Sequence, residues 1–122
     1  MTKDPRIYIE DCLDSISRVS GYVREVDRST FARSPAIQDA VIRRLEIIGE
    51  AAKRVPEPIK QHYRAIPWRS MAAMRDVLIH DYPEIVSDQV WITATEHLPH
   101  LQSQLQRVLA DLDAGDPSSA SG

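Results

Sequence analysis

The 122-residue chain has little cysteine, few aromatic residues and no long apolar run. Cys12 is its only cysteine, so an intrachain disulfide is impossible and a reducing compartment is expected. No stretch approaches the roughly 20 apolar residues of a transmembrane helix, and the N-terminus lacks the basic-then-apolar pattern of a signal peptide. We therefore expect a cytoplasmic protein that makes no use of a membrane.

The usual marks of metal and cofactor sites are also missing. The sequence has no cysteine and histidine cluster at zinc spacing, no glycine-rich phosphate loop, no nucleophile elbow and no dinucleotide fingerprint. A formal net charge of -3 argues against a protein that coats nucleic acid through bulk positive charge. The sequence thus predicts neither a metal nor a cofactor, and any contact with nucleic acid must be local.

What is present is the composition of an ordinary soluble domain, with 43% hydrophobic and 27% charged residues. Apolar residues recur at steps of three and four over about 4–26, 35–55 and 87–112, which predicts three amphipathic helices. Residues 68–82 are rich in helix formers, which predicts a further helix there. Asp4 and Ser87 are the expected N-caps of the first and last helices. Pro83 is expected to end the third helix near residue 82.

No segment shows strand-like alternation and no internal repeat is present. We therefore expect an all-α fold, an up-and-down four-helix bundle formed by residues 1–112 as one domain. A short extra helical turn is expected at residues 59–63, between prolines. Residues 113–122 are small and polar, which predicts a disordered C-terminal tail.

One short pattern, Arg75-x4-His80-x-Tyr82, is suited to chemistry. On a continuous helix Arg75 and Tyr82 lie nearly in line, and Asp76 and His80 form the neighbouring stripe. An arginine fork can hold a phosphate, and a histidine can move a proton near neutral pH. These groups suffice to cut RNA without metal: the 2′-hydroxyl attacks phosphorus, His80 acts as general base or acid, and Arg75 stabilises the developing charge. Asp76 would support the imidazole.

Structural explanations of these polar residues stay open. Arginine and histidine near a helix C-terminus complement the helix dipole, and a tyrosine before proline is a common surface anchor. For Glu46 and Glu50, a solvated acidic face is the favoured interpretation over a place in a cleft. Solubility is likewise the favoured explanation for the basic residues of the same helix, Arg43, Arg44, Lys53 and Arg54.

Two longer blocks carry a resemblance to a known family. Residues 38–55, QDAVIRRLEIIGEAAKRV, look like the second helix of HepT-like proteins. Residues 66–82, IPWRSMAAMRDVLIHDY, followed by Val90-Trp91, look like the signature block of that family. From about Pro5 to Leu112 the chain therefore resembles the HepT-like ribonuclease toxins of the HEPN superfamily. The resemblance implies a HEPN-type bundle and a homodimer that brings two copies of the motif into one cleft.

The resemblance also implies an activity and a means of control. It implies the toxin of a type VII toxin–antitoxin system, a metal-independent endoribonuclease in which Arg75 and His80 match the catalytic pair. Tyr82 matches the tyrosine to which a cognate nucleotidyltransferase antitoxin of the MntA type attaches AMP. Two alternatives stay open: a non-catalytic module that binds a nucleotide or a partner, and a degenerate nuclease kept as a regulatory subunit.

Overall fold

The computed structural model describes residues 4–76 and 83–115, and all regular secondary structure in them is helical. The all-α expectation is therefore confirmed. Within these ranges no helix is both long enough and apolar enough to cross a membrane. In chain order the elements are α1 (Pro5–Val23), α2 (Arg28–Ala32), α3 (Pro35–Arg54), α4 (Glu57–His62), α5 (Trp68–Ala73), the 3-10 turn η1 (Met74–Asp76), α6 (Pro83–Ile92), the π-helical segment η2 (Thr93–His97) and α7 (Leu98–Asp113).

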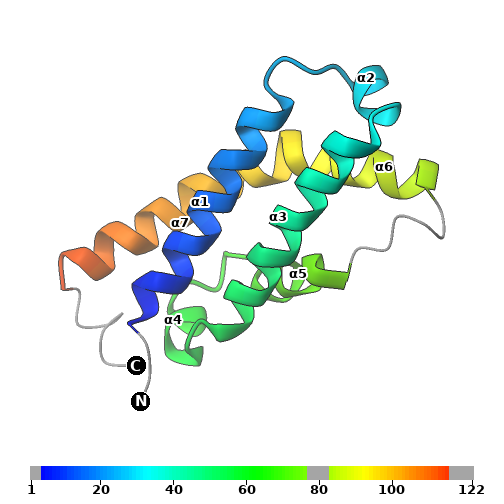
Figure 1. The fold of residues 1–122 in the computed structure, drawn as a ribbon. Coiled ribbons are helices and arrows are strands. Elements are labelled where there is room, and N and C mark those ends of the chain that lie inside the picture. Colours follow the sequence, from blue (N-terminus) through cyan, green and yellow to red (C-terminus); the bar gives the residue numbers. More distant parts are fainter. Residues whose placement is uncertain (1–3, 77–82, 116–122) are drawn as a thin grey trace.

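The long helices α1 and α3 lie side by side and run in opposite directions (Figure 1). Both begin where the sequence predicts, because Pro5 and Pro35 occupy first-turn positions that need no backbone N–H. The Asp4 carboxylate caps α1 by accepting a hydrogen bond from the backbone N–H of Arg6 at 3.0 Å. The expected extra turn between prolines is α4.

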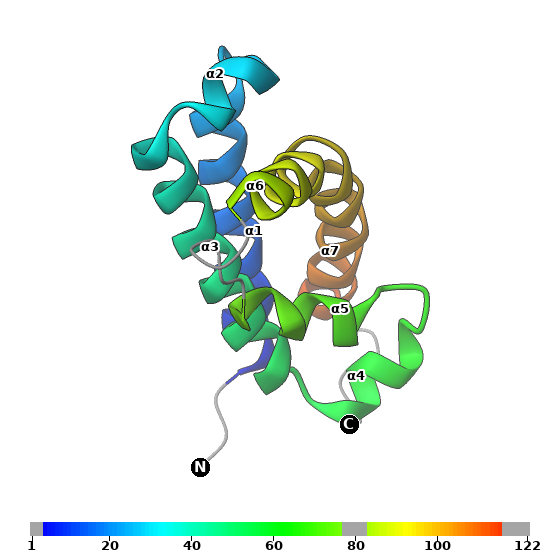
Figure 2. The ribbon, with the colours of Figure 1, turned by 90° about the vertical axis from the view of Figure 1, so that its right-hand side faces the viewer.

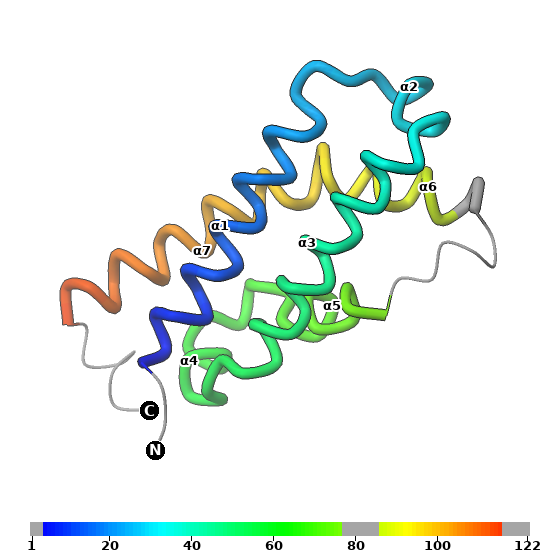
Figure 3. Tube along the Cα trace, in the orientation of Figure 1, coloured from blue at the N-terminus to red at the C-terminus, as the bar shows by residue number. Residues whose placement is uncertain are grey.

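Residues 83–113 form one helical run, α6–η2–α7, that changes direction along its length (Figures 2 and 3). Pro99 lies at the start of α7 and cannot donate a backbone hydrogen bond, which accounts for the wider π-helical turn just before it. The predicted N-cap at Ser87 is wrong. The helix already begins at Pro83, because proline is well suited to a first turn, and Ser87 is buried inside α6.

The third predicted helix differs most from expectation. An α-helix over 68–82 was predicted, but the α-helical part ends at Ala73 and continues as the 3-10 turn η1 through Asp76. Tightening of the last turn to 3-10 geometry is common at helix ends. Residues 77–82 lie outside the described residues, and with them His80 and Tyr82. The helical alignment of Arg75 with Tyr82 therefore stays a prediction.

The core lies where α1 packs against both α3 and α7. α5 and η1 pack on α3 from another side, and α2 packs against α6 at the far end of the bundle. Trp68 is buried, and Trp91 packs on the core beside Phe31 at a ring-centroid distance of 5.2 Å, so both tryptophans are packing anchors. This arrangement leaves η1, which carries Arg75, on the surface of α3.

Candidate active site

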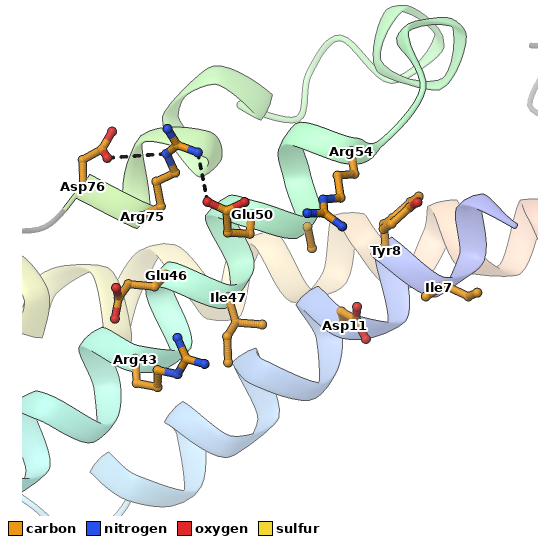
Figure 4. A pocket seen from close by; sticks show the side chains of 11 residues that line it. Ile7, Tyr8, Asp11, Arg43, Glu46, Ile47, Glu50, Arg54, Arg75 and Asp76 are labelled. Carbon is orange, nitrogen blue, oxygen red and sulfur yellow. Dashed lines mark hydrogen bonds and ion pairs between the residues drawn. The ribbon is translucent and has the colours of Figure 1, made fainter. Parts of the chain in front are cut away.

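Arg75 sits in η1 with its guanidinium directed at two carboxylates. Its Nη1 donates to Oε1 of Glu50 on α3 at 2.9 Å, and its Nε lies 3.5 Å from Oδ1 of Asp76 (Figure 4). The Arg75 side chain is 38% exposed and that of Glu50 is 50% exposed. Ion pairs this accessible add little to stability. Their main effect is to orient the guanidinium.

The guanidinium lies at one side of a surface groove with a volume of about 560 Å³. Residues of α3 and α1 face each other across this groove, and η1 closes one side of it (Figure 4). Its lining mixes charges of both signs with a few apolar side chains: Ile7, Tyr8, Asp11, Arg43, Glu46, Ile47, Glu50, Ala51, Arg54, Arg75 and Asp76. We call it the α1–α3 groove.

Helix geometry explains why α3 supplies so much of this lining. Glu46 and Glu50 are four residues apart and therefore share one face of the helix. Both line the groove. The favoured interpretation of the sequence, a solvated acidic face, is therefore incomplete, because both residues lie in a cleft. Arg43 and Arg54 line it as well, so they do more than keep α3 soluble.

Two of the four predicted site residues can be placed. Arg75 and Asp76 both lie at the α1–α3 groove, and Asp76 contacts Arg75. His80 and Tyr82 fall outside the described residues, so the predicted roles of His80, Tyr82 and of Asp76 toward the imidazole stay predictions. In the ranges that the structure covers, no group of three or more His, Cys, Asp or Glu side chains is arranged to hold a metal ion.

Glu50 is the residue whose part the sequence analysis underestimated. The available signal was its spacing of four from Glu46 on the predicted helix over 35–55. That spacing identifies a shared face but does not tell which helix the face meets. The packing of η1 on α3 decides it. Tyr8 of α1 was not singled out at all, because its place in the groove depends on how α1 crosses α3.

Comparison with known proteins places the chain in a family. The family model described as "Ribonuclease HepT-like" matches residues 12–108. "Probable ribonuclease HepT" of Thermococcus cleftensis is 38% identical over 108 residues, covering 88% of this chain and 98% of that protein. "Putative RNase MJ1216" of Methanocaldococcus jannaschii is 32% identical over 117 residues, covering 96% and 97%.

A longer relative contains a region like this chain. "Gamma-glutamylcyclotransferase and putative RNase MJ0434" of Methanocaldococcus jannaschii is 37% identical over 113 residues, which are 93% of this chain but only 51% of that protein. No solved structure matches the chain significantly. The family match covers most of the chain, including α3, η1 and the Arg75-x4-His80-x-Tyr82 pattern. The chain therefore belongs to the ribonuclease HepT-like family, and it is a ribonuclease by that membership.

Proposed function

We propose that the chain is a metal-independent endoribonuclease of the cytoplasm and the toxin of a type VII toxin–antitoxin system. The observation that carries this proposal is the placement of Arg75 in a chain of this family. Its guanidinium is held at the side of a groove, partly exposed, by a carboxylate from a neighbouring helix. A cation held for structure alone would gain little from so accessible a pair.

The geometry of Arg75 leaves it able to receive a phosphate. Glu50 accepts a hydrogen bond from Nη1 and Asp76 lies beside Nε, and among the described residues Nη2 donates no hydrogen bond. A guanidinium has five N–H donors, so an RNA phosphate can take those of Nη2 without displacing either carboxylate. In this proposal the two carboxylates orient the guanidinium and leave one edge toward substrate.

The reaction would be an internal transesterification. The 2′-oxygen forms a bond to the adjacent phosphorus as the bond to the 5′-oxygen breaks, which leaves a cyclic phosphate and a free 5′-hydroxyl. We assign His80 to the proton transfers, as base toward the 2′-hydroxyl or acid toward the 5′-oxygen. Arg75 stabilises the negative charge on the phosphoryl oxygens. Asp76 is assigned a supporting role beside them.

Cleavage of RNA in the presence of a chelator tests this proposal. Wild-type protein should cut, whereas Arg75→Ala and His80→Ala should lose cleavage by at least about a hundredfold, the scale expected for one transition-state contact or proton-transfer group. Arg107→Ala, at an exposed position of α7, is the matched control and should cut like wild type. Wild-type rates in either site variant, or activity that needs magnesium, would contradict the mechanism. RNA binding without cleavage in the wild type would favour the non-catalytic module.

Control of the enzyme is proposed to act through Tyr82. A nucleotidyltransferase antitoxin of the MntA type would attach AMP to its phenolic oxygen, and the resulting phosphodiester anion would compete with substrate for Arg75. Co-expression with such an antitoxin followed by intact-mass measurement tests this. Wild type should gain the mass of AMP and Tyr82→Phe should not. The same mass gain in both proteins would remove Tyr82 from the mechanism.

A homodimer completes the proposal. One Arg75 and one His80 make a sparse active site, whereas a two-fold axis beside the motif would supply two of each. Sedimentation at micromolar concentration should show a dimer. An active protein that sediments only as a monomer would rule out a site shared between subunits.

A further inference from the structure

Gly49 marks the place where η1 comes closest to α3. A Cβ atom built on this buried glycine would lie 2.7 Å from the backbone nitrogen of Arg75 and 3.0 Å from its Cβ. It would also lie 2.9 Å from the carbonyl oxygen of Ala72. Two of these three atoms belong to Arg75 itself. Only a residue without a side chain lets the backbone of Arg75 rest directly on α3.

The obstacle would be backbone, which cannot turn aside as the end of a flexible side chain can. Cβ atoms are essentially never found within 3.0 Å of such neighbours, so any larger residue at position 49 must push η1 away from α3. Glycine is also a poor residue for the interior of a helix. Its presence inside the 20-residue helix α3 is therefore explained by the close approach.

The next residue along α3 holds the other end of Arg75. Glu50 accepts the hydrogen bond from Nη1 at 2.9 Å, so consecutive residues of one helix contact the backbone and the guanidinium of the same arginine. A shift of η1 would move the start of the Arg75 side chain while Glu50 stayed in place. The guanidinium would then lose either its carboxylate or its direction toward the groove.

We propose that Gly49 is a positioning residue for RNA cleavage: by admitting the Arg75 backbone against α3, it sets where the guanidinium meets the scissile phosphate. The proposal rests on the function proposed above for Arg75. Misplacement of a reacting group by about 1 Å can cost a hundredfold in rate. Gly49 therefore acts on the reaction through Arg75 and without touching the substrate.

The test compares Gly49→Ala with Gly21→Ala. Gly21 lies in α1, and a Cβ there would meet nothing within 4 Å, so it is the matched control for adding a methyl group to a helix. Cys12, fully buried and the only cysteine, reports folding, because a thiol reagent reaches it only when the bundle opens. We expect Gly49→Ala to stay folded with its thiol protected and to lose tenfold or more in kcat, with a smaller change in KM. Gly21→Ala should match wild type in both.

Two further measurements separate positioning from general damage. In an Arg75→Lys background, Gly49→Ala should cause less than a twofold further loss of kcat, because its effect runs through the arginine. The NMR signals of the Arg75 backbone amide and Nε–H should move in Gly49→Ala and stay in place in Gly21→Ala. An unfolded Gly49→Ala protein, an unchanged kcat, or full additivity with Arg75→Lys would overturn the proposal. Absence of RNA cleavage in the wild type would defeat the proposed function, and the NMR shifts would then decide by themselves whether Gly49 places Arg75.

Discussion

At the scale of single residues, the contact between Arg75 and Glu50 is expected to contribute little to stability and more to activity. The pair is short, with 2.9 Å between Nη1 and Oε1, yet both side chains remain well exposed. Water screens such charges, so exposed pairs typically contribute only about 0.2–1 kcal/mol to folding. The same contact orients the guanidinium of Arg75, the one guanidinium in η1, at the α1–α3 groove. Its importance should therefore show in catalysis and hardly at all in stability.

Glu50→Gln tests this separation. The amide keeps the size of the side chain and one acceptor oxygen but removes the charge that holds the guanidinium. We expect a change in unfolding free energy below about 1 kcal/mol, together with a loss of several-fold or more in kcat for RNA cleavage. Glu10→Gln, at an exposed position on α1, is the matched control. A Glu50→Gln protein that cuts at the wild-type rate would show that the carboxylate has no part in placing Arg75.

At the scale of elements, α2 shows how a five-residue helix persists. Helices this short are not stable alone. The Asp27 carboxylate accepts a hydrogen bond from the backbone N–H of Thr30 at 2.7 Å, and Phe31 is buried against Trp91 of α6. The backbone hydrogen bond from Thr30 also lowers the pKa of Asp27 below its usual value. Capping at one end and burial at the other together hold α2 against α6.

The lowered pKa of Asp27 gives α2 a predictable response to acid. A carboxyl group with a lower pKa in the folded state stabilises the fold above its unfolded value of 3.8, and the contribution is lost as pH falls below that value. Asp27→Ala should lower the melting temperature at pH 7, whereas Asp27→Asn, which keeps a cap, should lower it less. Thermal melts at pH 7 and pH 3 check this. The gap between wild type and Asp27→Ala should narrow at pH 3, and a gap that widens would contradict the role of the charge.

At the scale of the whole molecule, the burial of Cys12 shows that the core is closed to solvent. It lies on α1 facing α3, and its Sγ is 3.7 Å from the carbonyl oxygen of Ile48. Burial, with a smaller effect of Asp11, raises the pKa of the Cys12 thiol from 9.0 to about 12. The thiol is therefore protonated in the folded protein at physiological pH. Cys12 serves as a packing residue of the core.

The raised pKa of Cys12 predicts a loss of stability in alkali. Above pH 9 the unfolded chain releases the thiol proton while the folded chain keeps it, so stability falls as pH rises from 9 toward about 12. The loss from this one group has a limiting slope of about 1.4 kcal/mol per pH unit. Urea unfolding from pH 8 to pH 10.5 should show a shallower decline for Cys12→Ala than for wild type. Equal slopes would mean that the thiol is not held protonated by burial.

Elements that depend on interactions between residues close in sequence could be predicted, and elements that depend on distant contacts could not. The starts of α1 and α3 and the position of α4 were predicted because caps, prolines and apolar spacing act within a few residues. α2 was missed because its stability comes from Phe31 meeting Trp91, sixty residues away in the chain. The end of α5 was misplaced because helix-forming residues continue through η1 although the backbone tightens there.

By itself, the sequence determined the helical class, the family and the arginine on which the proposed chemistry depends, since each of these rests on local spacing or on a continuous block of residues. Only the tertiary structure decided which helix face meets Arg75. It brings η1 onto α3 so closely that position 49 has no room for a side chain, and it pairs Glu50 with the guanidinium at 2.9 Å. Helical spacing can group Glu46 with Glu50 on one face, but the crossing of two helices is set by packing across the whole core, which no short stretch of sequence contains.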